Sequence, residues 1–434
     1  MNRLVATHDD YVHGTNLLLL RIFISTTLRA MSSPKKASIE VGARIRVEIE
    51  KVAHGGHFIA RHEGAVIFVR HAIPGESVEI EVTSVGASFN RADVVEVMTP
   101  SADRVTAPCR YAHRLGCGGC DFQHITPARQ RELKSEVISE QFSRIAKMEI
   151  EVEVEEVSAP LGWRTRCSAH STKSGALGFY QARSHKVTPV DDCRILVPEM
   201  KFAELAQRGV KGDQRLEISI SNTGERTIAT ANSRDESPMR LSDGPDVAHY
   251  RVGEKVLNVS QKSFWQSHKD APRVLSEVVI EFSRLKPGDH VLDLYGGVGL
   301  FAAAIAPLVG EEGSVDIVEG SKAATADASS NFADNSNVTV ITADVAKAIT
   351  RFTQADVIVL DPPREGAGKE VMQNCARIAP RAIIYVACDP AALARDTAYL
   401  RDYGYTLEKI RAFDLFPMTH HIECVARFVA NKVS

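Results

Sequence analysis

The sequence predicts an α/β fold in three parts: a C-terminal doubly wound sheet, an N-terminal β-barrel and a central α+β region. From about residue 272 onward, apolar strand-like runs alternate with helical stretches, as in a doubly wound, Rossmann-like parallel sheet. Residues 39–97 instead show short alternating runs separated by glycine-containing turns, which is typical of a small OB-like barrel. Residues 150–255 have several glycine breaks and no strong periodicity, so they are assigned only to an α+β region.

Length and composition describe an ordinary globular chain. Its 434 residues are enough for two or three domains, and 44% of them are hydrophobic and 25% charged. We expect an extension over residues 1–37, a barrel over 38–98, a central domain over 99–258 and a cofactor-binding domain over 259–434. The net charge of −3 does not attract phosphate overall, so any nucleic-acid surface must be a local basic patch.

The first residues resemble neither a membrane span nor a secretion signal. The apolar stretch Leu17–Ile24 is interrupted by Arg21 and is too short to cross a bilayer. No convincing small-residue cleavage site follows it. We therefore expect a cytoplasmic protein that contacts no membrane. We also expect Met31 to be the true start, with residues 1–37 either disordered or partly untranslated.

The predicted barrel has five strands and is followed by a helix. Barrels of this size commonly bind oligonucleotides, although a purely structural barrel fits the pattern equally well. Thr126 is a good N-cap residue with Pro127 at the first helical position, and apolar residues recur as far as Ile145. The strands are expected over residues 44–50, 57–61, 65–70, 78–83 and 92–97.

A glycine loop in the C-terminal part predicts an adenosine-containing cofactor. The strand at 291–294 runs into Tyr295 and the loop Gly296–Gly299, where the missing Cβ atoms let a ligand approach the backbone. Glu319 ends the next strand, where a carboxylate can accept both ribose hydroxyls. The pattern fits NAD as well as S-adenosylmethionine. The further parallel strands are expected over residues 315–318, 338–342, 357–360 and 383–387.

The segment that follows the strand at 357–360 favours S-adenosylmethionine. Asp361, Pro362 and Pro363 place a carboxylate and a stiff turn at the carboxyl edge of the sheet. Methyltransferases that act on planar bases commonly have such a wall, whereas NAD enzymes have no general need for it. An aspartate that merely caps a turn is the alternative.

Two residues are candidates for chemistry at this edge. Cys388 follows the apolar run 383–387, a position from which a thiol can act as a nucleophile, although a small core cysteine is the common alternative. Glu423 lies between apolar neighbours that can raise its pKa and suit it to proton transfer, unless it is simply an exposed carboxylate.

Four of the eight cysteines predict a metal site. Cys109, Cys117 and Cys120 are crowded together and Cys193 follows at a distance, a set that suits tetrahedral zinc or a [4Fe–4S] cluster. The paired spacing of a zinc ribbon is missing, which favours iron–sulfur. Nearby basic and aromatic residues are candidates for holding RNA, among them Arg110, Tyr111, Arg114, Trp163, Arg164 and Arg166.

Together these motifs resemble the RNA uracil-C5 methyltransferases that make 5-methyluridine, in particular the branch with a TRAM domain and an iron–sulfur cluster that acts on 23S ribosomal RNA. The resemblance covers roughly residues 38–430 and is most specific in the cluster cysteines, in 386–396 and in 416–423. It implies that Cys388 is the nucleophile, that Glu423 is the base and that the four cysteines hold a [4Fe–4S] cluster. It also implies S-adenosylmethionine contacts from Gln266, Tyr295, Glu319, Asp344 and Asp361.

The chain departs from that family at several positions. The family usually has Asn where this chain has Asp389, and Cys-Gly where it has Gly296-Gly297. The family often has Asn at the position of Leu300, and the pair His420-His421 is more like the cluster-free tRNA branch. We expect a monomer that acts on RNA, ribosomal RNA in preference to tRNA. An N-methyltransferase and a noncatalytic RNA-binding factor are the alternatives.

Overall fold

The computed structural model describes residues 39–233 and 237–431. The expectations for residues 1–37, including the start at Met31, lie outside the described residues. These described residues form one compact unit. Within the described ranges, no helix is both long and apolar enough to cross a membrane.

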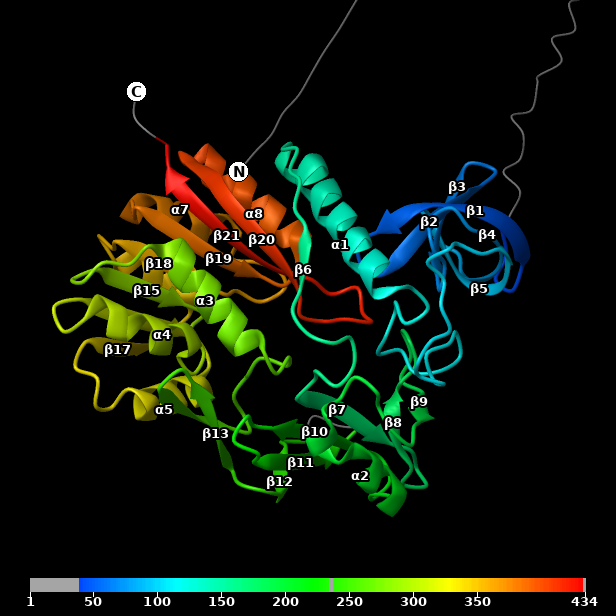
Figure 1. Cartoon of the computed structure of the whole chain (residues 1–434), viewed down its shortest axis with the longest axis horizontal. Coiled ribbons are helices and arrows are strands. Elements are labelled where there is room, and N and C mark those ends of the chain that lie inside the picture. The colour runs from blue at the N-terminus through cyan, green and yellow to red at the C-terminus, as the bar shows by residue number, and fades with distance from the viewer. Residues whose placement is uncertain (1–38, 234–236, 432–434) are drawn as a thin grey trace, which may run out of the picture. The chain divides into compact units, whose positions relative to one another are not determined.

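The N-terminal region is the expected closed barrel of five strands (blue in Figure 1). Its strand order is β1-β2-β3-β5-β4, and alternate side chains such as Phe58, Ile67 and Ile80 point into a fully buried interior. The turn between β1 and β2 contains Gly55 and Gly56, both at positive φ. The strands are β1 (Arg44–Ala53), β2 (His57–His62), β3 (Ala65–Arg70), β4 (Ser77–Ser84) and β5 (Asn90–Thr99).

A long helix, α1 (Pro127–Gln141), follows the cysteine segment and ends in a π-type turn, Phe142–Ala146. Thr126 occupies the predicted N-cap position and Pro127 the first turn, but the Thr126 side chain makes no capping hydrogen bond. Its hydroxyl donates to Asp103 Oδ1 at 3.0 Å, and no backbone N–H of the helix bonds to its side chain. The missing cap is offset by tertiary contacts, because the buried face of α1 packs against the barrel and the C-terminal domain.

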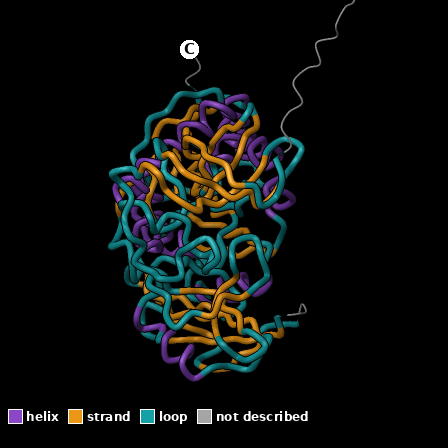
Figure 2. Tube along the Cα trace, turned by 90° about the vertical axis from the view of Figure 1, so that its right-hand side faces the viewer, coloured by secondary structure: helices purple, strands orange, loops and turns teal. Residues whose placement is uncertain are grey.

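The sequence did not predict the order of helices and strands in the central region. The structure shows a six-stranded antiparallel sheet there, in the order β12-β11-β10-β7-β8-β9. It is the strand-rich part at the bottom of Figure 2. Its helical elements are α2 (Phe202–Arg208) and a single 3-10 turn, Pro198–Met200. The strands are β7 (Arg166–Ser171), β8 (Leu177–Tyr180), β9 (Val187–Pro189), β10 (Gln214–Ile220), β11 (Arg226–Asn232) and β12 (Arg240–Asp243). A separate hairpin consists of β13 (Val247–Val252) and β14 (Lys255–Ser260).

The C-terminal sheet has eight strands in the order β17-β16-β15-β18-β19-β21-β20-β6. The five strands expected to be parallel are parallel, which confirms the Rossmann-like core. The sheet is nevertheless mixed, because β21 runs antiparallel to both β19 and β20. The strands are β6 (Val154–Glu156), β15 (His290–Leu294), β16 (Ser314–Glu319), β17 (Val338–Thr342), β18 (Val357–Leu360), β19 (Ala382–Ala387), β20 (Tyr405–Asp414) and β21 (Glu423–Ala430).

Helices cover both faces of this sheet (Figure 1). One face packs on α3, α4 and α5, and the other on α6, α7, α8 and α1. Both cores are made of side chains from nearly continuous apolar strands, as expected of a sheet buried on both sides. The helices are α3 (Ala271–Ser283), α4 (Leu300–Val309), α5 (Lys322–Asn331), α6 (Val345–Ala348), followed by the 3-10 turn Ile349–Arg351, α7 (Gly368–Ile378) and α8 (Pro390–Asp402).

Candidate active site and cysteine pocket

The pairing of β19 with β21 places the nucleophile candidate beside the base candidate. Ala387 pairs with Cys424, so Cys388 and Glu423 are the next two residues in the same antiparallel register. Parallel strand β18 lies on the other side of β19 and ends one residue before Asp361. A thiol and two carboxyl groups therefore meet at the carboxyl edge of the sheet, where doubly wound folds bind their ligands.

Burial raises the pKa values of all three groups, and charged neighbours raise those of Glu423 and Cys388 further. Glu423 is only 4% exposed, and burial, followed by the neighbouring Asp361, raises its pKa well above the usual value. Burial raises the pKa of Asp361 to about 7. Burial, together with Glu423 and Asp361, raises the pKa of the Cys388 thiol to about 12, while the Arg364 guanidinium acts in the opposite direction. Perturbed groups gathered at one sheet edge are typical of a functional site.

Cys388 opens into a polar pocket of about 480 Å³. The wall includes Arg364, for whose guanidinium the structure gives no hydrogen-bonding or ion-pairing partner, and His421, whose pKa is lowered to about 3 by burial and by neighbouring His420. An aspartate, Asp389, follows the thiol directly and caps α8. The pocket thus offers cationic and hydrogen-bonding groups to a polar planar ligand that reaches the thiol.

The glycine loop adopts the backbone that the sequence predicted for a cofactor site. Gly299 has φ +94°, and a Cβ on Gly296 would lie 2.8 Å from the Ile317 side chain. Tyr295 has the left-handed φ of 61°, an uncommon conformation that is concentrated at functional sites. Glu319 accepts a hydrogen bond from Gly297 N at 3.1 Å, so its carboxylate already touches the loop.

The other predicted cofactor residues lie along the same edge. Gln266 Nε2 donates to Asp361 Oδ2 at 3.4 Å. Asp344 is exposed and caps α6 through Lys347 N at 3.1 Å, close enough to Tyr295 to raise the pKa of that phenol along with burial. The structure therefore gathers the predicted residues from four strand ends and from the segment before α3.

Sequence reasoning overlooked Asp293, which lies beneath the glycine loop. This fully buried carboxyl accepts from Ala302 N at 3.1 Å, leaves Oδ1 without a partner and has its pKa raised to about 7 by burial. A charged residue inside the apolar run 291–294 was the available signal. His54, which also lines the Cys388 pocket, had no signal in the sequence because it belongs to the barrel.

The four predicted metal-binding cysteines line one small cavity. Its other walls are mostly apolar, with Tyr111, Phe179, Val190 and Ile195 among them. All four thiols are free. Burial raises the pKa values of Cys117 and Cys120, and raises that of Cys193 to about 12. Within residues 39–233 and 237–431, however, no group of three His, Cys, Asp or Glu side chains is arranged to hold a metal ion.

Several of the residues predicted to hold RNA have other roles. Trp163 is fully buried, so the prediction that it contacts RNA is wrong. Arg110 and Tyr111 both bond to Asp191, which occupies their polar groups. Arg114 contacts Glu81 of the barrel at 3.3 Å.

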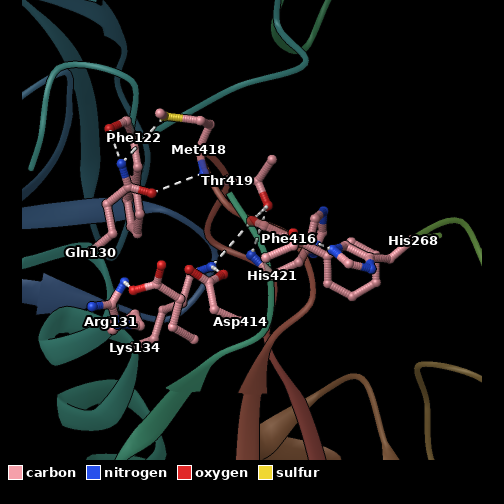
Figure 3. A network of polar contacts seen from close by, with 12 residues as sticks. Phe122, Gln130, Arg131, Lys134, His268, Asp414, Phe416, Met418, Thr419 and His421 are labelled. Atoms are coloured by element: carbon pink, nitrogen blue, oxygen red, sulfur yellow. Dashed lines mark hydrogen bonds and ion pairs between the residues drawn. The ribbon is translucent and has the colours of Figure 1, made fainter. Parts of the chain in front are cut away.

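A hydrogen-bonded network connects the cysteine segment to the loop that precedes Glu423 (Figure 3). Phe122 N donates to Met418 O at 3.0 Å, and Gln130 Oε1 accepts from Met418 N at 2.8 Å. Lys134 is buried and donates to Asp414 Oδ1 at 2.6 Å and to Phe416 O at 3.1 Å. The position of the catalytic-base candidate is therefore fixed by residues that follow the cysteines.

Two family descriptions match the sequence. Residues 248–430 match the tRNA (uracil-5-)-methyltransferase family, and residues 39–95 match the TRAM domain. An uncharacterized RNA methyltransferase of Streptomyces avermitilis is 41% identical over 424 residues, which cover 89% of this chain and 98% of that protein. The 23S rRNA (uracil(1939)-C(5))-methyltransferase RlmD of Shewanella amazonensis is 30% identical, with 92% and 98% covered.

A solved structure shares the fold over most of the chain. It is the Pyrococcus abyssi tRNA (uracil-54, C5)-methyltransferase in complex with S-adenosyl-L-homocysteine, with a TM-score of 0.67 and 22% identity. The match covers 88% of this chain and 99% of the archaeal one.

Proposed function

Because the chain belongs to the S-adenosylmethionine-dependent RNA uracil-C5 methyltransferases, we propose that it makes 5-methyluridine in 23S ribosomal RNA through a covalent bond between Cys388 and C6 of the target uracil. The observation that carries this proposal is the strand register that sets Cys388 beside the buried Glu423. One thiol and one base at the same sheet edge are what a C5 methylation requires.

The chemistry explains the need for a thiol. C5 of uracil is too weak a nucleophile to take a methyl group unaided. The Cys388 thiol first gives its proton to water in the open pocket, and the thiolate then adds to C6, which breaks the C5–C6 π bond and makes C5 enolate-like. S-adenosylmethionine supplies an electrophilic methyl group when it is bound.

Glu423 completes the reaction. After methylation, C5 carries both a methyl group and a proton, and the carboxylate removes that proton as the C6–S bond breaks and the thiolate is regenerated. The buried setting that raises the pKa of Glu423 makes it a stronger base than an exposed glutamate. The target base must leave its helix or lie in a single strand to reach the pocket.

The methyl donor would be held along the carboxyl edge of the sheet. Glu319 would bind the ribose hydroxyls of S-adenosylmethionine, and the backbone of the glycine loop would lie against the same ligand. The remaining contacts would come from neighbouring strand ends and from the segment before α3, through Tyr295, Asp344, Asp361 and Gln266.

We further propose that Cys109, Cys117, Cys120 and Cys193 hold a [4Fe–4S] cluster. Their thiols share one largely apolar cavity, which suits a cluster of low charge. The sequence lacks the paired cysteine spacing of a zinc ribbon, which favours a cluster over a single zinc ion. A cluster would cross-link the segment before α1 to the loop before η2 (Pro198–Met200), and it would need the reducing cytoplasm to persist.

The decisive experiment uses RNA that contains 5-fluorouridine. Fluorine at C5 cannot be removed by Glu423, so the wild-type protein with S-adenosylmethionine should accumulate a covalent RNA–protein complex that survives denaturing electrophoresis. Cys388→Ala should form no complex, whereas Cys375→Ala, which removes a buried thiol of α7, should form it normally. Methyl transfer by Cys388→Ala would instead support an N-methyltransferase, and no transfer by the wild type would support a noncatalytic factor.

The RNA target has its own test. We expect 5-methyluridine to disappear from 23S ribosomal RNA, and not from tRNA, in cells that lack this protein. Loss of the modification from tRNA alone would reverse the assignment.

A further inference from the structure

The first hairpin of the barrel reaches the catalytic pocket. His54, in the turn between β1 and β2, lines the same pocket as Cys388 and Asp389. Its Nε2 lies 2.9 Å from Asp389 Oδ2. Since a carboxylate only accepts hydrogen bonds, this ring nitrogen carries the proton and donates it. The barrel thus contacts the residue immediately after the nucleophile.

Asp389 uses its two carboxylate oxygens for different purposes. Oδ1 accepts from Ala391 N and Ala392 N, both at 2.9 Å, and so caps α8. Oδ2 is bound to His54. Burial raises the pKa of Asp389, but the bonds from His54 and the α8 amides outweigh it and lower the pKa overall. The carboxylate is therefore held charged and in one orientation between the barrel and the helix.

The same barrel turn also contacts the loop before Glu423. Gly56 has φ +77°, and a Cβ there would lie 2.8 Å from His420 Nδ1. That nitrogen is 2.6 Å from Asp121 Oδ2, so the cysteine segment fixes the ring from the other side. A single turn of the barrel is consequently packed against both loops that carry the proposed catalytic residues.

The exposure of the His54–Asp389 pair argues against a role in overall stability. The two side chains are 39% and 23% exposed, and pairs in such surroundings add little to folding. Their position argues for a role in catalysis, because a small displacement of a nucleophile can reduce the rate by a large factor.

We propose that His54 is a positioning residue that holds Cys388 in place through Asp389. The barrel would then form part of the catalytic pocket in addition to any role in binding RNA. This inference rests on the proposed nucleophilic role of Cys388. It assigns to the barrel turn a function that a module serving only to hold RNA would not have.

The test compares kcat and KM for methyl transfer to RNA in a double-mutant cycle. His54→Ala should lower kcat about ten-fold and leave KM for RNA within about two-fold, since the loss concerns placement of the nucleophile. His54→Gln, whose amide can still donate to Asp389, should recover most of kcat. In an Asp389→Asn background, His54→Ala should change kcat by less than about two-fold, because the partner charge is already gone. His249→Ala, which removes the exposed pair with Glu225, is the matched control.

Each outcome decides between alternatives. A higher KM with unchanged kcat in His54→Ala would overturn the inference in favour of direct RNA contact. An equal loss of kcat in the Asp389→Asn background would also overturn it, because the effect would not pass through Asp389. If the wild-type protein forms no adduct with 5-fluorouridine RNA, the proposed function itself fails. If the adduct forms and His54→Ala has wild-type kcat, only the inference fails.

Discussion

Two sites of this molecule present thiols to a cavity. They differ in the residues that surround the sulfur atoms. Cys388 directly follows β19, and Glu423, Asp361 and Arg364 are among its charged neighbours. The cysteine pocket gathers four thiols between mostly apolar walls. Burial raises thiol pKa values at both places. Burial alone therefore does not distinguish a nucleophile from a metal ligand.

The neighbours of each thiol make that distinction. A thiol beside a base and an open polar pocket can add to a substrate and leave again. Four thiols around one mostly apolar cavity would instead suit the proposed shared metal centre. The two sites are also joined, because Phe122, Gln130 and Lys134 connect the cysteine segment to the loop before Glu423.

The comparison predicts its largest effect at the base. Glu423→Gln should lower turnover by roughly 100- to 10,000-fold, because the amide cannot remove the C5 proton. Ordinary uridine RNA should then remain covalently attached to Cys388 after methylation, which denaturing electrophoresis with labelled RNA would reveal. Rapid turnover without a trapped complex would show that another group is the base.

Substitutions in the cysteine pocket should change the iron and sulfide content of the protein as well as its rate of methyl transfer. Protein purified without oxygen should contain about four iron and four sulfide atoms per chain, and Cys120→Ser should lose them and unfold at a lower temperature. Cys167→Ala, which removes a fully buried neighbour of Cys193 from outside the cavity wall, should keep them. One zinc per chain, or no metal at all, would contradict the cluster assignment.

The contacts that connect the two sites should contribute several kilocalories per mole to the free energy of unfolding. Lys134 and Asp414 have side chains only 1% and 4% exposed, so Lys134→Met leaves an unpaired buried carboxylate. We expect the free energy of unfolding to fall by about 3 kcal/mol. Lys51→Met breaks the exposed pair with Glu140 and should cost less than about 1 kcal/mol. Urea denaturation measures both, and equal values would show that Lys134 is not an energetic link.

The smallest predicted effect is a pH dependence that only the active-site edge should show. Burial raises the pKa of Asp361 from 3.8 to about 7, so at intermediate pH the folded protein holds a proton that the unfolded chain has released. The stabilising contribution of that proton is complete at acidic pH and is lost as the pH rises through about 7.

This dependence is best measured as a difference between proteins, because His421, with its lowered pKa, acts in the opposite direction. Relative to Asp361→Asn, the cofactor-free wild type should lose roughly 2–3 kcal/mol of unfolding free energy between about pH 5 and about pH 8 in urea titrations. Asp402→Asn removes an exposed carboxylate and serves as the control. A constant difference across this range would contradict a protonated Asp361.

The features predicted correctly from the sequence are local ones. The barrel strands and the parallel strands were predicted because the periodicity and the turn residues that indicate a strand lie within a few positions of it. The glycine loop was recognised for the same reason, since its backbone requires glycine at Gly299. Cys388 stood out because a thiol follows directly on a buried strand.

The features that the sequence did not disclose depend on pairings between distant segments. Strand β21 is largely apolar, and nothing within it indicates that it lies antiparallel between β19 and β20. His54 and Asp389 are 335 positions apart, so their contact exists only in the folded chain. Trp163 has the composition of an RNA-stacking residue, and only its complete burial excludes that role.

The position of β6 has a consequence for synthesis of the protein on the ribosome. This short strand pairs with β20, so Val154 must wait for Ala412, which is translated about 250 residues later. At roughly 5–20 residues per second, the wait is on the order of tens of seconds. The edge of β19 then waits for β21, which is translated about 40 residues after it, and unpaired edges invite aggregation. The last strands made are therefore the ones that close the sheet and bring in Glu423, so a chain released early would carry the proposed nucleophile without the proposed base.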